Sequence, residues 1–118
     1  MKRFMAIYTG SPTSAQRAQW DRLDADERSR RQAAGMKAWR EWVSAHQSAF
    51  VDGGGPLGKT KRVTSTGIAD THNNVAAYVI VQAESHEAAA RLFENHPHFS
   101  IFPGDGVEIM ECLPVPGQ

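Results

Sequence analysis

The chain has 118 residues, which is enough for one hydrophobic core and too few for two. Thirteen Lys and Arg residues balance thirteen Asp and Glu residues, so no net field favours nucleic acid or an anionic membrane. We therefore expect a single domain, residues 1–118, that binds neither nucleic acid nor a membrane. The first apolar run, Phe4 to Tyr8, is too short for a signal peptide or a membrane span.

The chain has a single cysteine, Cys112, which cannot form an internal disulfide. A lone thiol is ordinary in a protein kept in a reducing compartment. We expect a cytoplasmic protein whose Cys112 is an unreactive strand residue.

The N-terminal half predicts a strand followed by a long helical region. Phe4 to Tyr8 is an uninterrupted apolar run, typical of a buried strand. Thr13 to Gln16 has the form of a capping box, so we expect Thr13 to cap a helix. Gly35 is expected to kink this helix or divide it in two. After Gly35, the residues that fall on one inward face are Met36, Trp39, Arg40, Val43 and either His46 or Gln47, with Trp42 at the margin.

The C-terminal half predicts mainly strands. Phe50 to Leu57 and Arg62 to Thr66 are the next two, and a loop is expected over Asp70 to Asn74. Val75 to Val81 contains seven apolar residues without a break, which predicts a central strand.

A second helix should begin after Ser85, a good capping residue, and end at His96 and Pro97. Val107 to Leu113 is the expected last strand. This element order predicts an α+β domain in which the helices cover one face of a mainly antiparallel sheet.

The strand composition also predicts a homodimer. In a sheet with one solvated face, apolar residues alternate with polar ones, yet Phe4 to Tyr8 and Val75 to Val81 do not alternate. Both faces of these strands therefore favour burial. Because two helices cover only one face, we expect a second copy of the chain to cover the other, sheet against sheet.

Residues 53 to 60 match the spacing of a phosphate-binding loop, with Gly53 first and Gly58-Lys59-Thr60 last. Such a loop needs a helix directly after it, whereas Lys61 to Thr66 is typical of a strand. A second interpretation is an anion cradle in which backbone N–H groups meet basic side chains. We favour a strand end at the rim of a cleft, where Gly53, Gly54 and Gly55 contact a ligand.

Histidines are the natural acid or base candidates near neutral pH. His46, late on the first helical region, could meet Asp52 at the glycine rim and form a proton-transfer pair. The alternative is that His46 bonds a carbonyl at the helix end. His96 is the third candidate catalytic residue.

His96 and His98 flank Pro97 and could form a metal set with Asp105 or His72. The sequence contains no recognised zinc spacing, so we expect neither a metal nor a cofactor, and we assign His98 to ligand contact.

Three tryptophans could line an aromatic pocket or, alternatively, belong to the core or the dimer interface. They are Trp20, Trp39 and Trp42. We assign Trp39 to ligand contact.

Several short strings, taken in order, resemble the YCII-related family, including its DGPF-type members. They are Gly54-Gly55-Pro56-Leu57, Ser85-His86-Glu87-Ala88-Ala89, His96-Pro97-His98 and Gly106-Val107-Glu108-Ile109. The resemblance covers nearly the whole chain and implies a ferredoxin-like domain that pairs through its sheets into a dimeric α+β barrel.

The resemblance implies less about activity. Some members are thought to use a His on the first helix and an Asp just before the Pro that ends the second helix. Here His96 stands before that Pro, and the segment Met36 to Trp39 contains no His. The DGPF string is also absent, with Gly67 to Asp70 in its approximate place.

Three functions remain open at the level of sequence. The first is a small-molecule-binding protein, with or without an enzyme activity that uses histidine acid/base chemistry in a cleft between sheet and helix. The second is a noncatalytic regulatory or ligand-binding dimer, and the third is a cofactor-free oxygenase of the dimeric-barrel type. An enzyme of the first kind needs a His that meets a carboxylate in a polar pocket, whereas a binding protein needs an apolar one.

Overall fold

A computed structural model of the chain describes residues 1–117. It contains six strands, four α-helices and one short 3-10 helix, η1. In chain order they are β1 (Lys2–Thr9), α1 (Ala15–Asp21), α2 (Ala25–Ala45), η1 (Gln47–Ala49), β2 (Phe50–Pro56), β3 (Thr60–Thr64), β4 (Gly67–Thr71), β5 (Val75–Ala83), α3 (His86–Arg91), α4 (Pro97–Ser100) and β6 (Gly106–Glu111). No helix within residues 1–117 is long and apolar enough to cross a bilayer.

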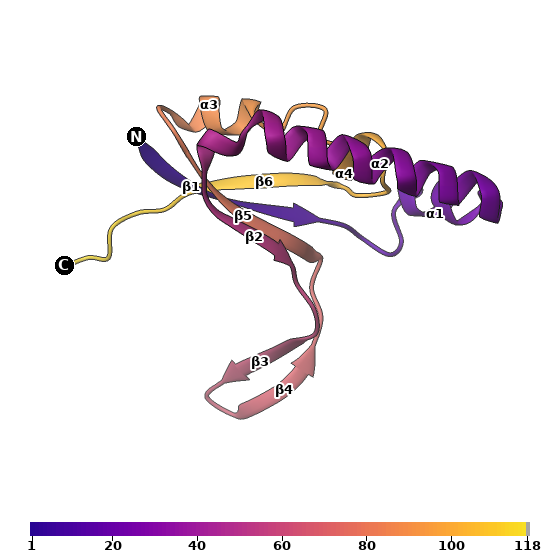
Figure 1. Cartoon of the computed structure of the whole chain (residues 1–118). Helices are drawn as coiled ribbons and strands as arrows, with labels where there is room; N and C mark the ends of the chain where they lie inside the picture. The colour runs from indigo at the N-terminus through magenta and orange to yellow at the C-terminus, as the bar shows by residue number, and fades with distance from the viewer. Residues whose placement is uncertain (118) are drawn as a thin grey trace.

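Four strands form one antiparallel sheet in the order β2-β5-β1-β6, and β3 pairs with β4 in a separate hairpin. Without the hairpin, the chain follows the β-α-β-β-α-β pattern of ferredoxin-like domains. The helices lie above the sheet in Figure 1. The predicted α+β fold with helices on one face of an antiparallel sheet is therefore confirmed.

The two faces of the sheet are both apolar at their centres. On the helix-covered face, the buried residues of β1 and β5 include Phe4, Ala6, Tyr8, Val79 and Val81. On the opposite face, which we call the open face, strand alternation and pairing place Met5, Ile7, Val51, Tyr78, Ile80 and Met110. This arrangement explains why the two central strands show no alternation of apolar and polar residues.

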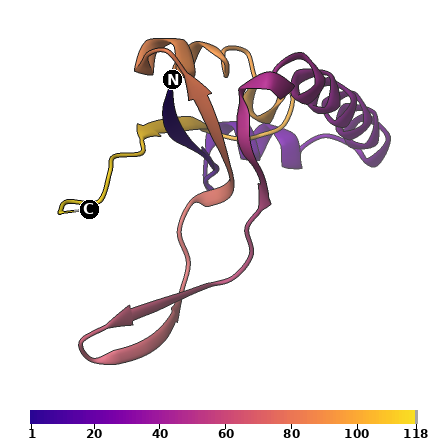
Figure 2. The ribbon, with the colours of Figure 1, turned by 60° about the vertical axis from the view of Figure 1, so that its left-hand side comes forward.

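The β3–β4 hairpin projects away from the body of the protein on the side opposite the helices (Figures 1 and 2). Val63 and Ile68 pair across it, and each is 73% exposed. The radius of gyration, 16.4 Å, exceeds the value of about 13.5 Å that a compact chain of this length has. We call β3–β4 the arm. The loop predicted over Asp70 to Asn74 is wrong in its first part, because Asp70 and Thr71 end β4.

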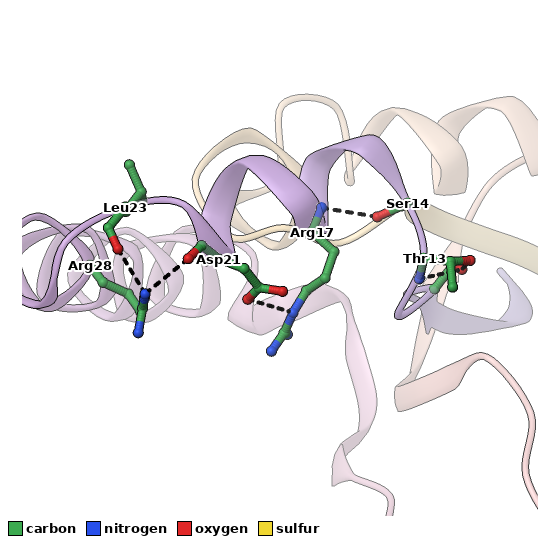
Figure 3. Close-up of polar contacts among 7 residues, drawn as sticks. Thr13, Ser14, Arg17, Asp21, Leu23 and Arg28 are labelled. Atoms are coloured by element: carbon green, nitrogen blue, oxygen red, sulfur yellow. Dashed lines mark hydrogen bonds and ion pairs between the residues drawn. The ribbon is translucent and has the colours of Figure 1, made fainter.

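The predicted start of the first helix is wrong by one residue. Ser14, not Thr13, caps α1, and its Oγ accepts the backbone N–H of Arg17 at 3.0 Å (Figure 3). The side chain of Arg28, on α2, donates to the carbonyl oxygens of Asp21, the last residue of α1, and of Leu23 in the turn after it. These bonds satisfy carbonyls that a helix end leaves free, and they fix the turn between α1 and α2.

Gly35 does not break the helical region, because α2 continues through it as one helix. A Cβ at this position would lie 2.5 Å from Cε2 and Cζ of Phe102. Gly35 therefore allows Phe102 to pack closely against α2, which explains the glycine without a kink.

Pro97 begins a helix instead of ending one. The second helix, α3, ends at Arg91, and α4 starts with Pro97 at its first position. Proline suits this position because its missing N–H has no partner in the first turn. Ser85 caps α3 as predicted, by accepting the N–H of Ala88 at 3.0 Å.

Candidate functional site

A cleft of about 410 Å³ lies between α2, the edge strand β2 and the helix-covered face of the sheet. Its volume is within the range of small-molecule sites. The lining residues come from all three elements and carry no charged side chain: Tyr8, Met36, Trp39, Trp42, Val43, Phe50, Gly53, Gly55, Pro56, Ala77, Tyr78 and Val79.

The glycine string forms one rim of this cleft, as the sequence predicts for Gly53 and Gly55. Gly54 has a different role. Its φ is 61°, and a Cβ there would overlap the carbonyl oxygen of Tyr78 on β5. Only glycine therefore allows β2 to approach β5 at this point. The strand β3 follows at Thr60, so the helix that a phosphate-binding loop requires is absent here.

An aromatic cluster packs along one side of the cleft, and we define it as Tyr8, Trp39, Trp42, Phe93 and His96. Tyr8, Trp39 and Trp42 line the cleft, and Phe93 and His96 pack behind them. Trp39 and Trp42 are three positions apart on α2 and both point toward the sheet. The ring centroids of Trp39 and Tyr8 are 5.3 Å apart, and those of Trp42 and Phe93 are 5.2 Å apart. Trp42, which the sequence places at the margin of the inward face, is central to it. Its Nε1–H donates to the carbonyl of Leu92 at 2.8 Å.

His96 is the fully buried member of the cluster, with 0% of its surface exposed. Trp39 and Trp42 present their rings to it at centroid distances of 4.6 and 4.5 Å. Burial lowers the pKa of His96 to about 4, and the charges of His98 and His46 act in the same direction. The imidazole is therefore neutral at physiological pH.

Tyr8 connects His96 with the cleft. Its hydroxyl oxygen lies 3.3 Å from Nε2 of His96, and the residue is only 3% exposed. Burial raises the pKa of the Tyr8 hydroxyl, so the phenol keeps its proton. The site thus presents a neutral hydroxyl that is supported by a neutral imidazole.

His46 and Asp52 do not bond to each other in the described part of the chain. Nδ1 of His46 donates to the carbonyl of Trp42 at 2.9 Å, which is the helix-end alternative that the sequence leaves open. Asp52 accepts the N–H of Gly54 at 2.8 Å and the hydroxyl of Tyr78 at 3.5 Å. The predicted proton-transfer pair would need both side chains to leave these partners.

The other histidines also contact backbone or solvent. Nε2 of His98 donates to the carbonyl of Thr9 at 2.8 Å, and Nε2 of His86 donates to that of Ile109 at 2.8 Å. His98 packs against Tyr8, at a centroid distance of 5.2 Å, and it does not line the cleft. His72 is exposed at the base of the arm.

Residues 1–117 contain no group of three or more His, Cys, Asp or Glu side chains that could hold a metal ion. Trp20 packs against Phe102, at a centroid distance of 5.9 Å, and does not line the cleft. Cys112 is an exposed free thiol just after β6. The three tryptophans thus divide between the two alternatives, with Trp20 in the packing between helices and loops and the other two at the cleft.

Sequence reasoning misses the role of Tyr8, which it treats only as part of a buried strand. It also misses the cleft contributions of Phe50, Ala77 and Val79. A signal was present for Tyr8, because a tyrosine in a buried run needs a partner for its hydroxyl. The remaining contributions depend on how β2 pairs with β5.

No protein-family model and no curated protein sequence matches the chain. Among solved structures, the chain is similar to 5-chloro-2-hydroxyhydroquinone dehydrochlorinase (TftG) from Burkholderia phenoliruptrix AC1100, in complex with 2,5-dihydroxybenzoquinone. The TM-score is 0.54 at 14% identity, over 94% of this chain and 93% of TftG. This similarity is one of fold: the chain shares its α+β architecture with TftG, a protein of the dimeric α+β barrel type.

The buried His96 predicts a specific dependence of stability on pH. Its pKa in the folded state, about 4, is below the ordinary value of 6.5, so between these pH values the unfolded chain binds a proton that the folded chain does not. The free energy of unfolding should therefore fall as the pH drops from 6.5 to 4, by up to about 1.4 kcal/mol per pH unit from this group. Below pH 4 the contribution of His96 is fully lost.

Urea unfolding of the wild type and of His96→Gln at several pH values measures this effect. Glutamine keeps an N–H donor for Tyr8 but does not titrate, so the variant should show a shallower slope between pH 6.5 and 4. Equal slopes would show that His96 is not buried in its neutral form.

Proposed function

We propose that this protein binds a small, largely apolar organic molecule in the cleft between α2 and the sheet. The observation that carries the proposal is an apolar cleft of about 410 Å³ that is bounded by Trp39 and Trp42 and lined by the buried Tyr8, whose hydroxyl bonds His96. Small-molecule sites commonly combine an apolar lining with a few fixed polar groups. Flat aromatic walls favour a planar ligand, because ring faces stack in offset or edge-on arrangements.

The composition of the cleft favours binding over general-base chemistry. Its lining contains no His, Asp or Glu side chain, so no group there removes a proton from a ligand. A histidine can act on a bound ligand only indirectly, because His96 contacts the hydroxyl of Tyr8 and does not itself line the cleft. We therefore favour the ligand-binding hypothesis, with any catalysis limited to stabilising negative charge that develops on a bound oxygen.

We further propose that the protein is of the YCII-related type and acts in the cytoplasm. The strings that resemble this family lie at the cleft rim, at the start of α3, at His96 and in β6. The free thiol of Cys112, exposed on the surface, suits a reducing compartment. The similarity in fold to TftG, whose structure contains a quinone, is in keeping with a planar organic ligand.

The proposed working form is a twofold dimer in which the open faces of two chains pack together. Six apolar side chains occupy this face, and Val51 and Met110 are 39% and 42% exposed. The arm projects on the same side as this face (Figures 1 and 2), so its exposed Val63 and Ile68 would flank a chain that lies there. Burial of such a surface is the main source of stability in permanent dimers.

The charges on the open face support a second copy of the chain as the partner. Arg3 and Glu108 lie toward opposite ends of this face, because Arg3 is near the start of β1 and Glu108 pairs with Ile7 near its end. A partner turned end for end would bring each of these charges opposite the other. Such self-complementarity is what a twofold interface requires.

Replacing either of two neighbouring alanines of β5 by phenylalanine tests the ligand site. Ala77 lines the cleft, whereas the neighbouring Ala76 is exposed at the register shift of β5 and does not line it. Ala77→Phe should fill the cleft and abolish binding of a neutral planar probe, 2-acetylnaphthalene, while Ala76→Phe should leave it nearly unchanged. Chemical shifts of the tryptophan indole N–H groups, recorded by NMR during titration, report the binding. Failure of the wild type to shift Trp39 or Trp42 with this probe, or equal effects of the two variants, would contradict the proposal.

Two methionines with similar exposure provide a matched test of the dimer. Met110 is on the open face and is 42% exposed, while Met36 is on α2 and is 49% exposed. Met110→Asp should weaken dimerisation at least tenfold, because it would place a carboxylate in the buried interface. Met36→Asp should leave the dimer intact. Analytical ultracentrifugation measures both, and a wild type that sediments as a monomer at micromolar concentration would overturn the dimer.

A further inference from the structure

The hydrogen bonds around His96 fix which nitrogen carries its proton. The backbone N–H of His98 donates to Nδ1 of His96 at 3.0 Å. A nitrogen that accepts a hydrogen bond has no proton, so the neutral imidazole carries its proton on Nε2. The short helix α4 holds this arrangement, because His96 is its N-cap.

The protonated Nε2 then determines what the Tyr8 hydroxyl does. Nε2 of His96 is 3.3 Å from the Tyr8 oxygen, so the imidazole donates and the Tyr8 oxygen accepts. The hydroxyl keeps its own proton, and within residues 1–117 it makes no second hydrogen bond with the protein. Since Tyr8 is 97% buried and lines the cleft, the cleft is where a partner for this proton can lie.

We propose that Tyr8 is the specificity-determining hydrogen-bond donor of the cleft, and that the ligand is an uncharged planar compound with a carbonyl-type oxygen that accepts this bond. This inference rests on the proposed function and names the class of molecule that the cleft selects. A ligand without an acceptor leaves a buried hydroxyl unpaired when it displaces water, which is unfavourable. A site that is built to hydrogen-bond a ligand therefore rejects the analogue that lacks the bonding atom.

The absence of a cation in the lining excludes an anionic ligand group at this position. The side chains that surround the Tyr8 ring are Trp39, Phe93, His96 and His98. Both imidazoles already donate, one to Tyr8 and one to the carbonyl of Thr9. A carboxylate bound here would lose its hydration and gain a single hydroxyl partner, which does not compensate for the loss.

Three probes of nearly equal shape test the assignment. 2-Acetylnaphthalene has a carbonyl oxygen, 2-isopropenylnaphthalene replaces this oxygen with a methylene group, and 2-naphthoate carries a charge. Wild-type protein should bind the ketone about tenfold or more tightly than the hydrocarbon, which is the difference in affinity that one buried hydrogen bond gives. It should bind 2-naphthoate more weakly than the ketone.

Tyr8→Phe keeps the ring and removes only the hydroxyl, so the ketone and the hydrocarbon should bind this variant about equally. The ratio of the two affinities within each protein is the readout, because it cancels any general loss of binding caused by the substitution. Circular dichroism and the NMR spectrum of the indole N–H groups confirm that the variant folds. Trp39→Phe serves as a control that should lower the affinity for both probes while keeping the ratio of the two affinities.

The outcomes separate the two levels of the hypothesis. Binding of none of the three probes to the wild type would overturn the proposed function. Binding of ketone and hydrocarbon with equal affinity, or a preference for the ketone that persists in Tyr8→Phe, would overturn the role of Tyr8 while leaving the apolar cleft as a ligand site. Tightest binding of 2-naphthoate would overturn the uncharged class.

Discussion

The burial of one neutral imidazole connects three parts of the fold that are far apart in the sequence. His96 contacts Tyr8 at the end of β1 and Trp39 and Trp42 on α2, and it caps α4 with its own side chain. A buried polar group of this kind is costly unless both of its nitrogens have partners, and here both have one. This contact helps to hold α2 above the sheet, together with the hydrogen bond from Trp42 to the carbonyl of Leu92, and so contributes to the shape of the cleft.

The two faces of the sheet have different proposed roles, one in ligand binding and the other in dimerisation. The helix-covered face contributes Tyr8, Ala77 and Val79 to the cleft, and the open face offers an apolar surface to a second chain. β2 takes part in both, since Gly53 and Gly55 line the cleft and Val51 belongs to the open face. A substitution or a partner chain at the open face would therefore also shift the cleft residues of β2. The pairing of this edge strand with β5 is already irregular.

The arm and the cleft share the same stretch of chain. β2 leads out of the cleft rim and into β3, and β4 leads back into β5, which lines the cleft floor. A partner that holds the arm would also hold the rim at Gly55 and Pro56. In the proposed dimer, assembly thus stabilises the ligand site without a direct contact between partner and ligand.

Sequence patterns predict the main strands and α3 because local rules decide them. Val75 to Val81 has few alternatives to a strand, and Ser85 caps α3 through a bond to a residue three positions away. The errors occur where distant contacts override local preferences. Gly35 stays helical because Phe102 packs against it, Pro97 starts a helix whose cap is His96, and Ile68 extends into a hairpin through pairing with Val63.

The site residues divide in the same way, between those placed by local patterns and those placed by distant contacts. Trp39, Gly53 and Gly55 line the cleft because helical spacing and the glycine string place them there, and their assignment to ligand contact stays a prediction. The pairing of His46 with Asp52 is plausible from sequence distance alone, but each side chain has a closer backbone partner. Tyr8 and His96 are 88 residues apart and meet only in three dimensions, so no local pattern reveals the pair.

The protonation state of His96 is the most direct test of this account, and long-range ¹H–¹⁵N NMR of the histidine rings measures it. We predict a neutral ring with its proton on Nε2 and an unprotonated Nδ1 throughout the range from pH 8 to about pH 5. A ring that carries its proton on Nδ1 would contradict it, because Nε2 would then accept the Tyr8 proton and leave none for the cleft. A ring that is doubly protonated at pH 7 would contradict it too, because Nδ1 could then no longer accept the N–H of His98.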